Sequence, residues 1–260
     1  MKKVYRERPR VLLIDIETAP LLANVWGLFD QTVGLNQVER DWHLLAVSAK
    51  WLGDPPTKVE YRDQRKAKNL EDDKKLARFA WQLLDEADVV IAHNGNKFDI
   101  KKLNARFLAH GFQPPSSFRK IDTFLLAKKH FGFTSNKLEY LSEKFCKEFK
   151  KSKHTKFPGF ELWKEVMRGN KEAWAMMESY AVLDVLALEE LYQRLAPWDS
   201  FSFTIYQDEV KCKCGSEDFK KWGWFYTANR KYQRFKCKSC GYEWRATKCA
   251  RSAAYGGIAR

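Results

Sequence analysis

At 260 residues and 30.6 kDa the chain can hold one domain of about 200 residues and a smaller module, at roughly 100–200 residues per domain. Its formal net charge is +14 at pH 7, from 47 Lys and Arg against 33 Asp and Glu. This excess favours a polyanionic partner, although a basic surface without a specific partner is the alternative. The start of the chain has no signal-peptide pattern, and no apolar run approaches the ~20 residues that span a bilayer. We therefore expect an intracellular, cytoplasmic protein that does not associate with membranes.

Apolar patterning predicts alternating strands and helices as far as about Trp198. In chain order we expect a buried strand over residues 11–14, strands over 43–51 and 58–61, a helix over 70–84, a short strand over 88–92, and helices over 97–110, 136–145, 160–168 and 171–195. Gly53 to Pro56 separates the second strand from the third. The expected elements are strands at first, then a mixture of strands and helices, and finally helices. This order predicts an α/β domain with a mixed sheet flanked by helices.

Asp15 and Glu17 follow the first strand and are the first candidates for chemistry. Residues two apart on a strand place their side chains on the same side of the sheet. Burying two carboxylates together is costly unless cations neutralise them. Hard divalent cations such as Mg²⁺ or Mn²⁺ prefer oxygen ligands and would do so. The alternative is a solvated strand end that carries two acids.

Three residues from two other segments could join this site. Asp99 lies in the first turn of a predicted helix, where an acid is also a common capping residue. Tyr180 and Asp184 are one helical turn apart, so both can face one site. Taken alone, Tyr180 would most often be a half-buried packing residue and Asp184 a surface acid. The combination is more specific than its parts and predicts a divalent-metal site for phosphodiester hydrolysis.

These segments resemble the DEDD superfamily of 3′-to-5′ exonucleases, a ribonuclease H-like group that includes polymerase proofreading domains and ribonuclease D. The three motifs appear as DIE at 15–17, NGNKFD at 94–99 and YAVLD at 180–184, in the expected order. A Tyr four residues before the last Asp matches the tyrosine subclass, since the histidine subclass carries His at the position of Ser179. The resemblance covers about residues 9–195.

The resemblance implies two Mg²⁺ or Mn²⁺ ions in a ribonuclease H-like fold. Asp15, Glu17 and Asp184 would hold one metal, and Asp15 and Asp99 the second. One metal would lower the pKa of the attacking water and the other would stabilise the departing 3′ oxygen, while Tyr180 would orient the water. Members of this family often carry a further acid near the site, and Asp122 occupies the corresponding position in this chain.

Other residues near these motifs are candidates for contact with nucleic acid. His93 and Asn94 could touch the nucleotide, although a structural histidine at a strand end is an equal alternative for His93. His154, in a Lys-rich segment, is interpreted as part of a loop that follows the phosphates.

The composition changes after Pro197. Residues 201–260 hold 13 Lys and Arg against 5 Asp and Glu, and 13 aromatic residues with few aliphatic ones. Such a segment needs a structural metal in place of an ordinary core. Clustered cysteines in a reducing compartment indicate metal binding before disulfides. The predicted ligands of one structural Zn²⁺ in a zinc ribbon are Cys212, Cys214, Cys237 and Cys240, with Cys249 as an alternative because only one residue separates Cys212 from Cys214.

Aromatic residues alternate with Lys and Arg between the two cysteine pairs. Rings at period two suit strands of the ribbon, and the simplest interpretation is that they form its small core. Their number exceeds what so small a core needs, so we prefer stacking on bases, with basic residues following the backbone. The candidates for nucleic-acid binding are Trp222, Trp224, Tyr226, Arg230, Lys231 and Tyr232. A protein partner of the ribbon is the alternative.

The predicted organisation is an exonuclease domain over residues 1–200, a zinc ribbon over 205–250 and a tail over 251–260. We expect a monomeric, metal-dependent 3′-to-5′ exonuclease of single-stranded or frayed nucleic acid, with DNA slightly favoured over RNA. A phage-encoded or nucleoid-associated enzyme is compatible with these features. The alternatives are a recruitment protein on an inactive nuclease fold, and an endonuclease or exoribonuclease on the same fold.

Overall fold

The computed structural model describes residues 9–150, 156–199, 212, 214–227 and 230–246. These residues form two compact units, one of Pro9–Tyr192 and one that begins at Gln193. Each unit is described by itself below.

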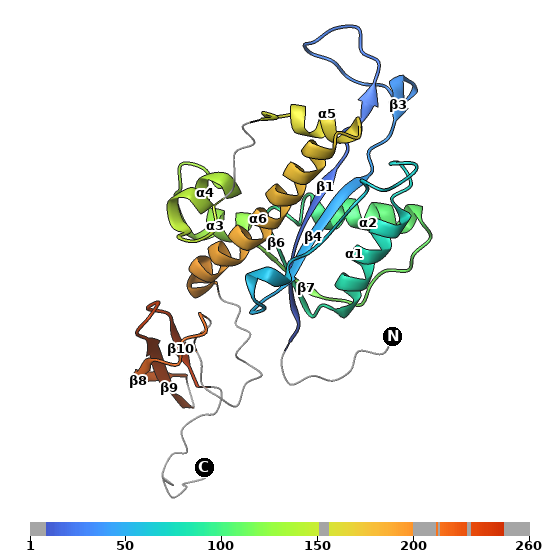
Figure 1. Ribbon diagram of the computed structural model, residues 1–260. Coiled ribbons are helices and arrows are strands. Elements are labelled where there is room, and N and C mark those ends of the chain that lie inside the picture. Colours follow the sequence, from blue (N-terminus) through green and yellow to red (C-terminus); the bar gives the residue numbers. More distant parts are fainter. Residues whose placement is uncertain (1–8, 151–155, 200–211, 213, 228–229, 247–260) are drawn as a thin grey trace, which may run out of the picture. The chain divides into compact units, whose positions relative to one another are not determined.

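The larger unit is built on a five-stranded sheet with the strand order β5-β4-β1-β6-β7 (Figure 1). The strands are β1 (Val11–Thr18), β4 (Leu44–Trp51), β5 (Glu60–Asp63), β6 (Val89–Ala92) and β7 (Arg119–Asp122). β4 runs antiparallel to both β1 and β5, whereas β6 runs parallel to both β1 and β7. The sheet is therefore mixed, as the order of elements predicts.

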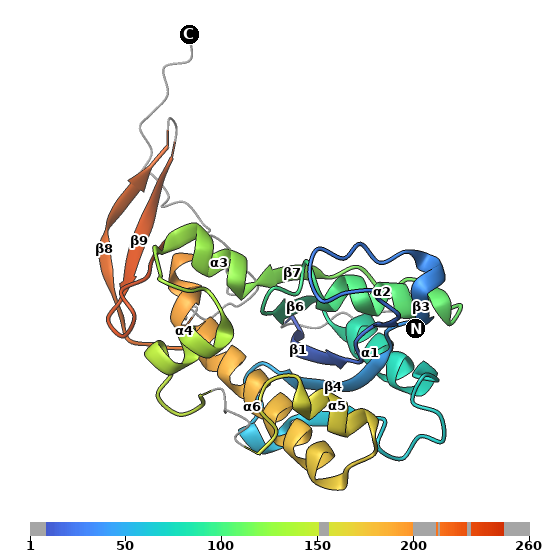
Figure 2. The ribbon, with the colours of Figure 1, turned by 90° about the horizontal axis from the view of Figure 1, so that it is seen from above.

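Helices cover both sides of this sheet (Figure 2). α1 (Lys74–Glu86) and α2 (Asp99–Ala109) pack on one side, where their buried residues form a core cluster with Leu12, Ile14 and Ile16 of β1. α5 (Glu161–Met167) and α6 (Lys171–Leu195) pack on the other side, around Leu45 of β4. α3 (Thr123–His130) and α4 (Leu138–Phe145) complete the unit. The predicted mixed sheet flanked by helices is thus confirmed.

Several boundaries differ from the predicted ones for local reasons. The strand expected over 58–61 begins at Glu60, because Pro56–Lys58 forms a 3₁₀ turn. The helix expected over 70–84 begins at Lys74, because the carbonyl oxygens of Leu70 and Asp72 accept hydrogen bonds from the Gln64 side chain outside any helix. β7 and α3 were not predicted, since four-residue and eight-residue elements carry little periodicity.

Between β1 and β4 the chain forms a hairpin in which β2 (Leu22–Ala23) pairs with β3 (Val38–Arg40). Its loop presents large apolar side chains to solvent, including Trp26 at 98% and Leu28 at 90% exposed. This hairpin therefore adds little to the core of the unit.

The smaller unit contains a three-stranded antiparallel sheet with the order β10-β9-β8. Its strands are β8 (Phe219–Tyr226), β9 (Lys231–Cys237) and β10 (Glu243–Arg245). The rings of Phe219, Phe235 and Trp244 lie 5.4–5.7 Å apart between centroids and form its aromatic core. The predicted small β module is confirmed. Within the described ranges, no helix has the length and apolar character that crossing a membrane requires.

Candidate functional site

β1 turns Asp15 and Glu17 towards α6. Because Leu12, Ile14 and Ile16 pack with α1 and α2, the alternate residues of β1 point to the opposite side of the sheet. Asp15 is paired in register with Ser48 of β4, and the Ser48 hydroxyl donates a hydrogen bond to the Ala181 carbonyl oxygen of α6 at 3.0 Å. Ser48 and Asp15 share one side of the sheet, so both face this helix.

Tyr180 and Asp184 come from the adjacent turns of α6 and are buried, at 7% and 3% exposed. The pKa of Tyr180 is raised above its ordinary value, first by burial and then by the negative charges of Asp184, Glu17 and Asp15. The Tyr180 hydroxyl also donates a hydrogen bond to the Asp184 carboxylate. The hydroxyl therefore lies among carboxylates contributed by both β1 and α6.

Asp99 is the first residue of α2 and is bonded to the same strand. The backbone N–H of Ile16, between Asp15 and Glu17, donates to Asp99 Oδ1 at 3.2 Å. Burial, followed by the charge of Asp122, raises the pKa of Asp99 to about 7, although backbone N–H groups act to lower it. The structure thus brings the three motif segments together at β1.

The loop before Asp99 approaches β6 closely, and Gly95 makes this approach feasible. A Cβ atom on Gly95 would lie 2.4 Å from the Cβ of Ala92 and 3.5 Å from Asp99 Oδ2. Asn94, in the left-handed region with φ 63°, turns the chain into this loop. A side chain at position 95 would therefore clash with Ala92 and displace the loop from β6, whereas its contact with Asp99 would be an ordinary one.

Asp122 holds this loop in place. Its carboxylate accepts hydrogen bonds from the backbone N–H groups of Asn94 at 2.9 Å and Asn96 at 3.1 Å. It also caps the N-terminus of α3 by accepting from Phe124 and Leu125. From the sequence alone, Asp122 is noted as an acid near the site but has no assigned role. Its position before Thr123 and an apolar run is a helix N-cap signal that could have indicated the capping role.

The nucleotide-contact candidates in this loop have defined positions. His93 Nδ1 lies 2.9 Å from Thr123 Oγ1 and His93 Nε2 lies 2.9 Å from the Asn136 carbonyl oxygen. Both ring nitrogens have protein partners, which is the arrangement of a structural histidine. Asn94 is half-buried, and its side-chain contact with nucleic acid stays a prediction. His154 lies outside the described residues.

The carboxylates suit hard divalent cations by their chemistry, since all their donor atoms are oxygens and three of the four groups are buried. The carboxylate oxygens lie farther from one another than the sulfur atoms of the four cysteines do. Within the described part of the chain, one group of three or more ligand-type side chains has all its donor atoms within 4.8 Å of one another, and it consists of the four cysteines.

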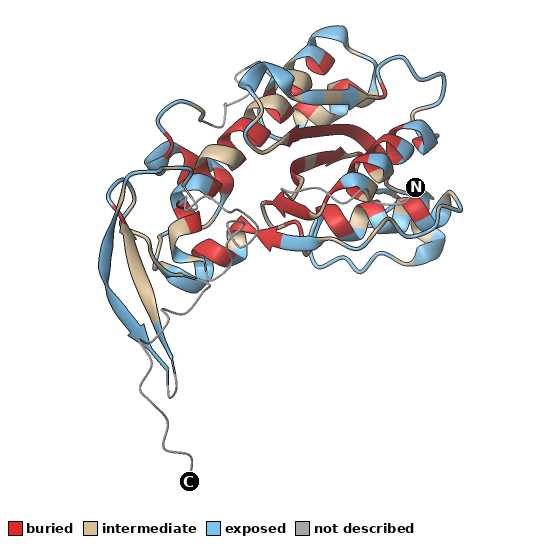
Figure 3. Ribbon diagram, turned by 90° about the horizontal axis from the view of Figure 1, so that it is seen from below, coloured by how far each residue is buried: buried red, intermediate tan, exposed pale blue. Residues whose placement is uncertain are grey.

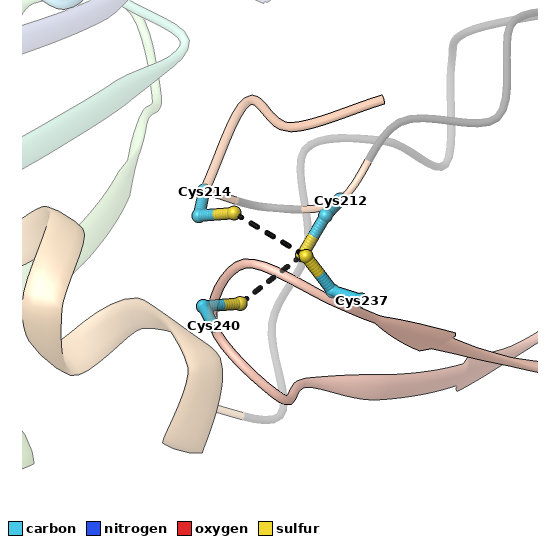
Figure 4. Close-up of side chains that lie close together, drawn as sticks. All are labelled: Cys212, Cys214, Cys237 and Cys240. Carbon is cyan, nitrogen blue, oxygen red and sulfur yellow. Dashed lines mark hydrogen bonds between the residues drawn. The ribbon is translucent and has the colours of Figure 1, made fainter. Parts of the chain in front are cut away.

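Cys212, Cys214, Cys237 and Cys240 converge from two turns of the smaller unit (Figure 4). Cys212 Sγ lies 3.4 Å from Cys240 Sγ, and Cys214 Sγ lies 3.7 Å from Cys237 Sγ. Each turn ends at a glycine with positive φ, Gly215 or Gly241, whose N–H bonds back to the carbonyl oxygen of Cys212 or Cys237. Four converging sulfurs fit tetrahedral zinc. The alternative ligand Cys249 lies outside the described residues.

Burial acts to raise the pKa of Cys237, but hydrogen bonds from backbone N–H groups and neighbouring thiols lower it to about 6. A thiolate is the form that binds metal, so this environment suits a ligand.

The six ribbon residues predicted to contact nucleic acid all lie in β8, β9 or the connection between them, and a β-bulge divides them between two sides of the sheet.

The raised pKa of Asp99 predicts a pH dependence of stability in buffer without added divalent metal. A carboxyl group with a folded pKa of about 7 against an ordinary value of 3.8 binds its proton more tightly in the folded state. The free energy of unfolding should therefore fall as pH rises from about 4 to about 7, by a few kcal/mol at roughly 1.4 kcal/mol per pKa unit. Urea unfolding at several pH values should show a smaller fall in Asp99→Asn than in the wild type. Parallel curves for the two proteins would contradict this assignment, and Asp54→Asn, at a half-buried turn position, serves as the control.

The larger unit matches a known family along most of its length. The family model described as RNase_H superfamily matches residues 12–196. Among solved structures, the family B DNA polymerase from the hyperthermophilic archaeon Pyrobaculum calidifontis is similar, with a TM-score of 0.52 and 17% identity over 73% of this chain and 25% of the polymerase. The chain thus spans about a quarter of the length of that polymerase. No curated protein matches the sequence.

Proposed function

This chain belongs to the RNase_H superfamily, and on that premise we propose that it is a metal-dependent nuclease that removes nucleotides from the 3′ end of single-stranded or frayed nucleic acid. The observation that carries the proposal is the position of the Tyr180 hydroxyl among the charges of Asp15, Glu17 and Asp184. Asp99 joins this group through its hydrogen bond with the Ile16 N–H. Buried carboxylates in such a cluster favour binding of divalent cations, because the cations remove their repulsion.

Asp15, Glu17 and Asp184 would hold one Mg²⁺ or Mn²⁺, and Asp15 and Asp99 a second. Two such ions, when bound, lower the pKa of an attacking water and stabilise charge on the departing oxygen. The protein groups then have separate tasks. Asp122 and Gly95 position the loop that ends at Asp99. The Tyr180 hydroxyl, which donates to Asp184, would accept a hydrogen bond from the attacking water and so orient it. Because burial raises the pKa of Asp99, a proton competes with metal more strongly at this carboxylate than at an ordinary one.

The 3′-to-5′ direction rests on the three motifs, DIE at 15–17, NGNKFD at 94–99 and YAVLD at 180–184, which resemble the tyrosine subclass of DEDD exonucleases. The smaller unit carries net positive charge and exposed rings, which favours a nucleic acid as its partner as well.

Matched DNA and RNA strands with a 5′ label test this proposal. We expect shortening from the 3′ end that requires Mg²⁺ or Mn²⁺ and stops when the 3′ end is blocked. Internal cleavage of the blocked strand would indicate an endonuclease on the same fold. Absence of metal-dependent cleavage of every strand would refute the nuclease and leave a binding protein. The comparison of DNA with RNA identifies the preferred sugar, which depends on contacts with the 2′-hydroxyl.

Tyr180→Phe is expected to lower turnover by about ten- to a thousandfold, the usual cost of one oriented hydrogen bond at a transition state. Metal affinity should change little, since the carboxylates remain and the ring still packs against Trp163. Single-turnover rates and metal titrations measure the two effects separately. Tyr192→Phe makes the same change about 18 Å further along α6, at ~1.5 Å per residue, and should retain wild-type turnover. Equal rates for all three proteins would assign Tyr180 to the core alone.

A further inference from the structure

The side-chain alternation of β8 changes at Gly223. Lys221 pairs with Phe235 and Trp224 pairs with Gln233, so Trp222 and Gly223 together oppose the single residue between these partners on β9. Gly223 has φ +78°, as the extra residue of a β-bulge requires. Trp222 and Trp224 are two apart in the sequence and would share one side of a regular strand. The bulge instead places them on opposite sides of the sheet.

Contacts with lysine side chains confirm this division. The Trp222 ring lies 4.4 Å from Lys220 Nζ and 4.8 Å from Lys236 Nζ, and Lys220 and Lys236 are register partners on one side. The Trp224 ring lies 4.9 Å from Lys231 Nζ, which belongs to the other side. We call the first side the Trp222 face. It consists of Lys220, Trp222, Phe225, Tyr232, Arg234, Lys236, Glu243 and Arg245.

Rings and cations of the Trp222 face extend over all three strands. Phe225 of β8 is paired with Tyr232 of β9, and the Arg245 guanidinium of β10 lies 4.7 Å from the first ring and 4.4 Å from the second. Trp222 and Phe225 are each 42% exposed. β8 is exposed along almost its whole length (Figure 3).

The opposite face supplies the core of the unit. Phe219, Phe235 and Trp244 are on that face and contact one another, and Trp244 also stacks on Tyr242 beside the cysteine turns. The aromatic core is thus complete without the rings of the Trp222 face. Those exposed rings need another explanation than packing.

The charges of the Trp222 face indicate the chemistry of its partner. Four cations stand against one carboxylate, Glu243, which pairs with Arg234 and with Lys236. We infer that the Trp222 face binds a single strand of nucleic acid, whose bases stack on Trp222, Phe225 and Tyr232 and whose phosphates contact the surrounding Lys and Arg. This inference deepens the proposed function and rests on it for the class of substrate. It leaves Trp224, Tyr226 and Lys231 outside the binding face because they share the side of Phe235 and the aromatic core, although Trp224 is 39% and Tyr226 68% exposed.

Substitution of single rings in the full-length protein tests the inference. Trp222→Leu and Phe225→Leu should each weaken binding of a fluorescent, 3′-blocked oligonucleotide by about five- to 150-fold, the range for loss of one stacked base. Trp224→Leu makes the same change on the opposite face and should bind within about twofold of wild type. Anisotropy titrations without added divalent metal give the affinities, and zinc content shows that each variant has folded. Equal affinities of Trp222→Leu and Trp224→Leu would overturn the inference.

Glu243→Gln provides a test of opposite sign. Removing the carboxylate releases Arg234 and Lys236, so binding at low salt should become tighter by severalfold and its salt dependence steeper. Lys220→Gln should instead reduce the slope of log affinity against log salt by about 0.7, the value for one phosphate contact on a single strand. If Glu243→Gln binds more weakly than wild type at full zinc content, the face does not contact phosphates.

The binding assays and the nuclease assay can fail independently. A chain that releases no nucleotides but loses affinity with Trp222→Leu refutes the nuclease and retains the binding face. A chain that degrades single strands but binds equally well in every ring variant refutes the binding face alone. The second result would make a protein the better candidate for the partner of these rings.

Discussion

Asp184→Asn is expected to abolish metal-dependent hydrolysis, with turnover reduced on the order of a thousandfold or more, about 4 kcal/mol of transition-state stabilisation. Asp184 is buried beside Tyr180, Glu17 and Asp15, and an amide oxygen at this position would be a neutral and weaker ligand of a hard cation than the carboxylate. Asp15→Asn should have an effect of the same size. The folded state should persist, because one of several repelling charges has been removed.

Two measurements separate this prediction from simple unfolding. The midpoint of thermal unfolding in buffer without added divalent metal should be unchanged or slightly higher in both variants. Turnover should be unaffected in Glu178→Gln, which changes an exposed carboxylate of the same helix that pairs with Arg65. Wild-type turnover in either Asp184→Asn or Asp15→Asn would exclude the proposed site.

Replacement of both Cys237 and Cys240 by Ser is expected to unfold the smaller unit and to leave the larger one folded. Structural zinc contributes about 10–16 kcal/mol of binding energy in zinc-finger peptides, and the few aliphatic residues beyond about 205 cannot replace it. Zinc content should fall from one ion per chain to none. Degradation of short strands should continue, because every carboxylate of the proposed site precedes residue 185.

Binding of long strands should weaken in this double variant, with a shallower salt dependence, because residues 201–260 carry 13 Lys and Arg against 5 Asp and Glu. Truncation after Pro197 should have the same effect. Cys146→Ser is the matched control, since Cys146 is buried in the larger unit, where its thiol contacts the Ala187 carbonyl oxygen. Equal binding and equal salt slopes in truncated and full-length chains would show that the smaller unit does not hold nucleic acid.

Features that depend on residues close together in the chain could be predicted from the sequence. The spacing of Asp15 and Glu17 on a strand, and of Tyr180 and Asp184 on a helix, requires only the periods of these elements. The four cysteines could be assigned to one cluster from a different local signal, their occurrence as two closely spaced pairs. β7 and α3 were missed, because elements this short leave too little periodicity, and α3 depends on the cap that Asp122 provides.

Other properties of the site exist only in the folded chain. The sequence by itself indicated the candidate residues of the proposed site, the mixed α/β class and the cysteine cluster of the smaller unit. Tertiary structure decided the raised pKa of Asp99, which comes from burial, and the role of Asp122 as a clamp across 28 residues to Asn94. It also decided which rings share a face, because the bulge at Gly223 reverses the alternation that the sequence period implies. Burial, long-range hydrogen bonds and strand register arise from contacts between distant segments, and a local pattern cannot encode them.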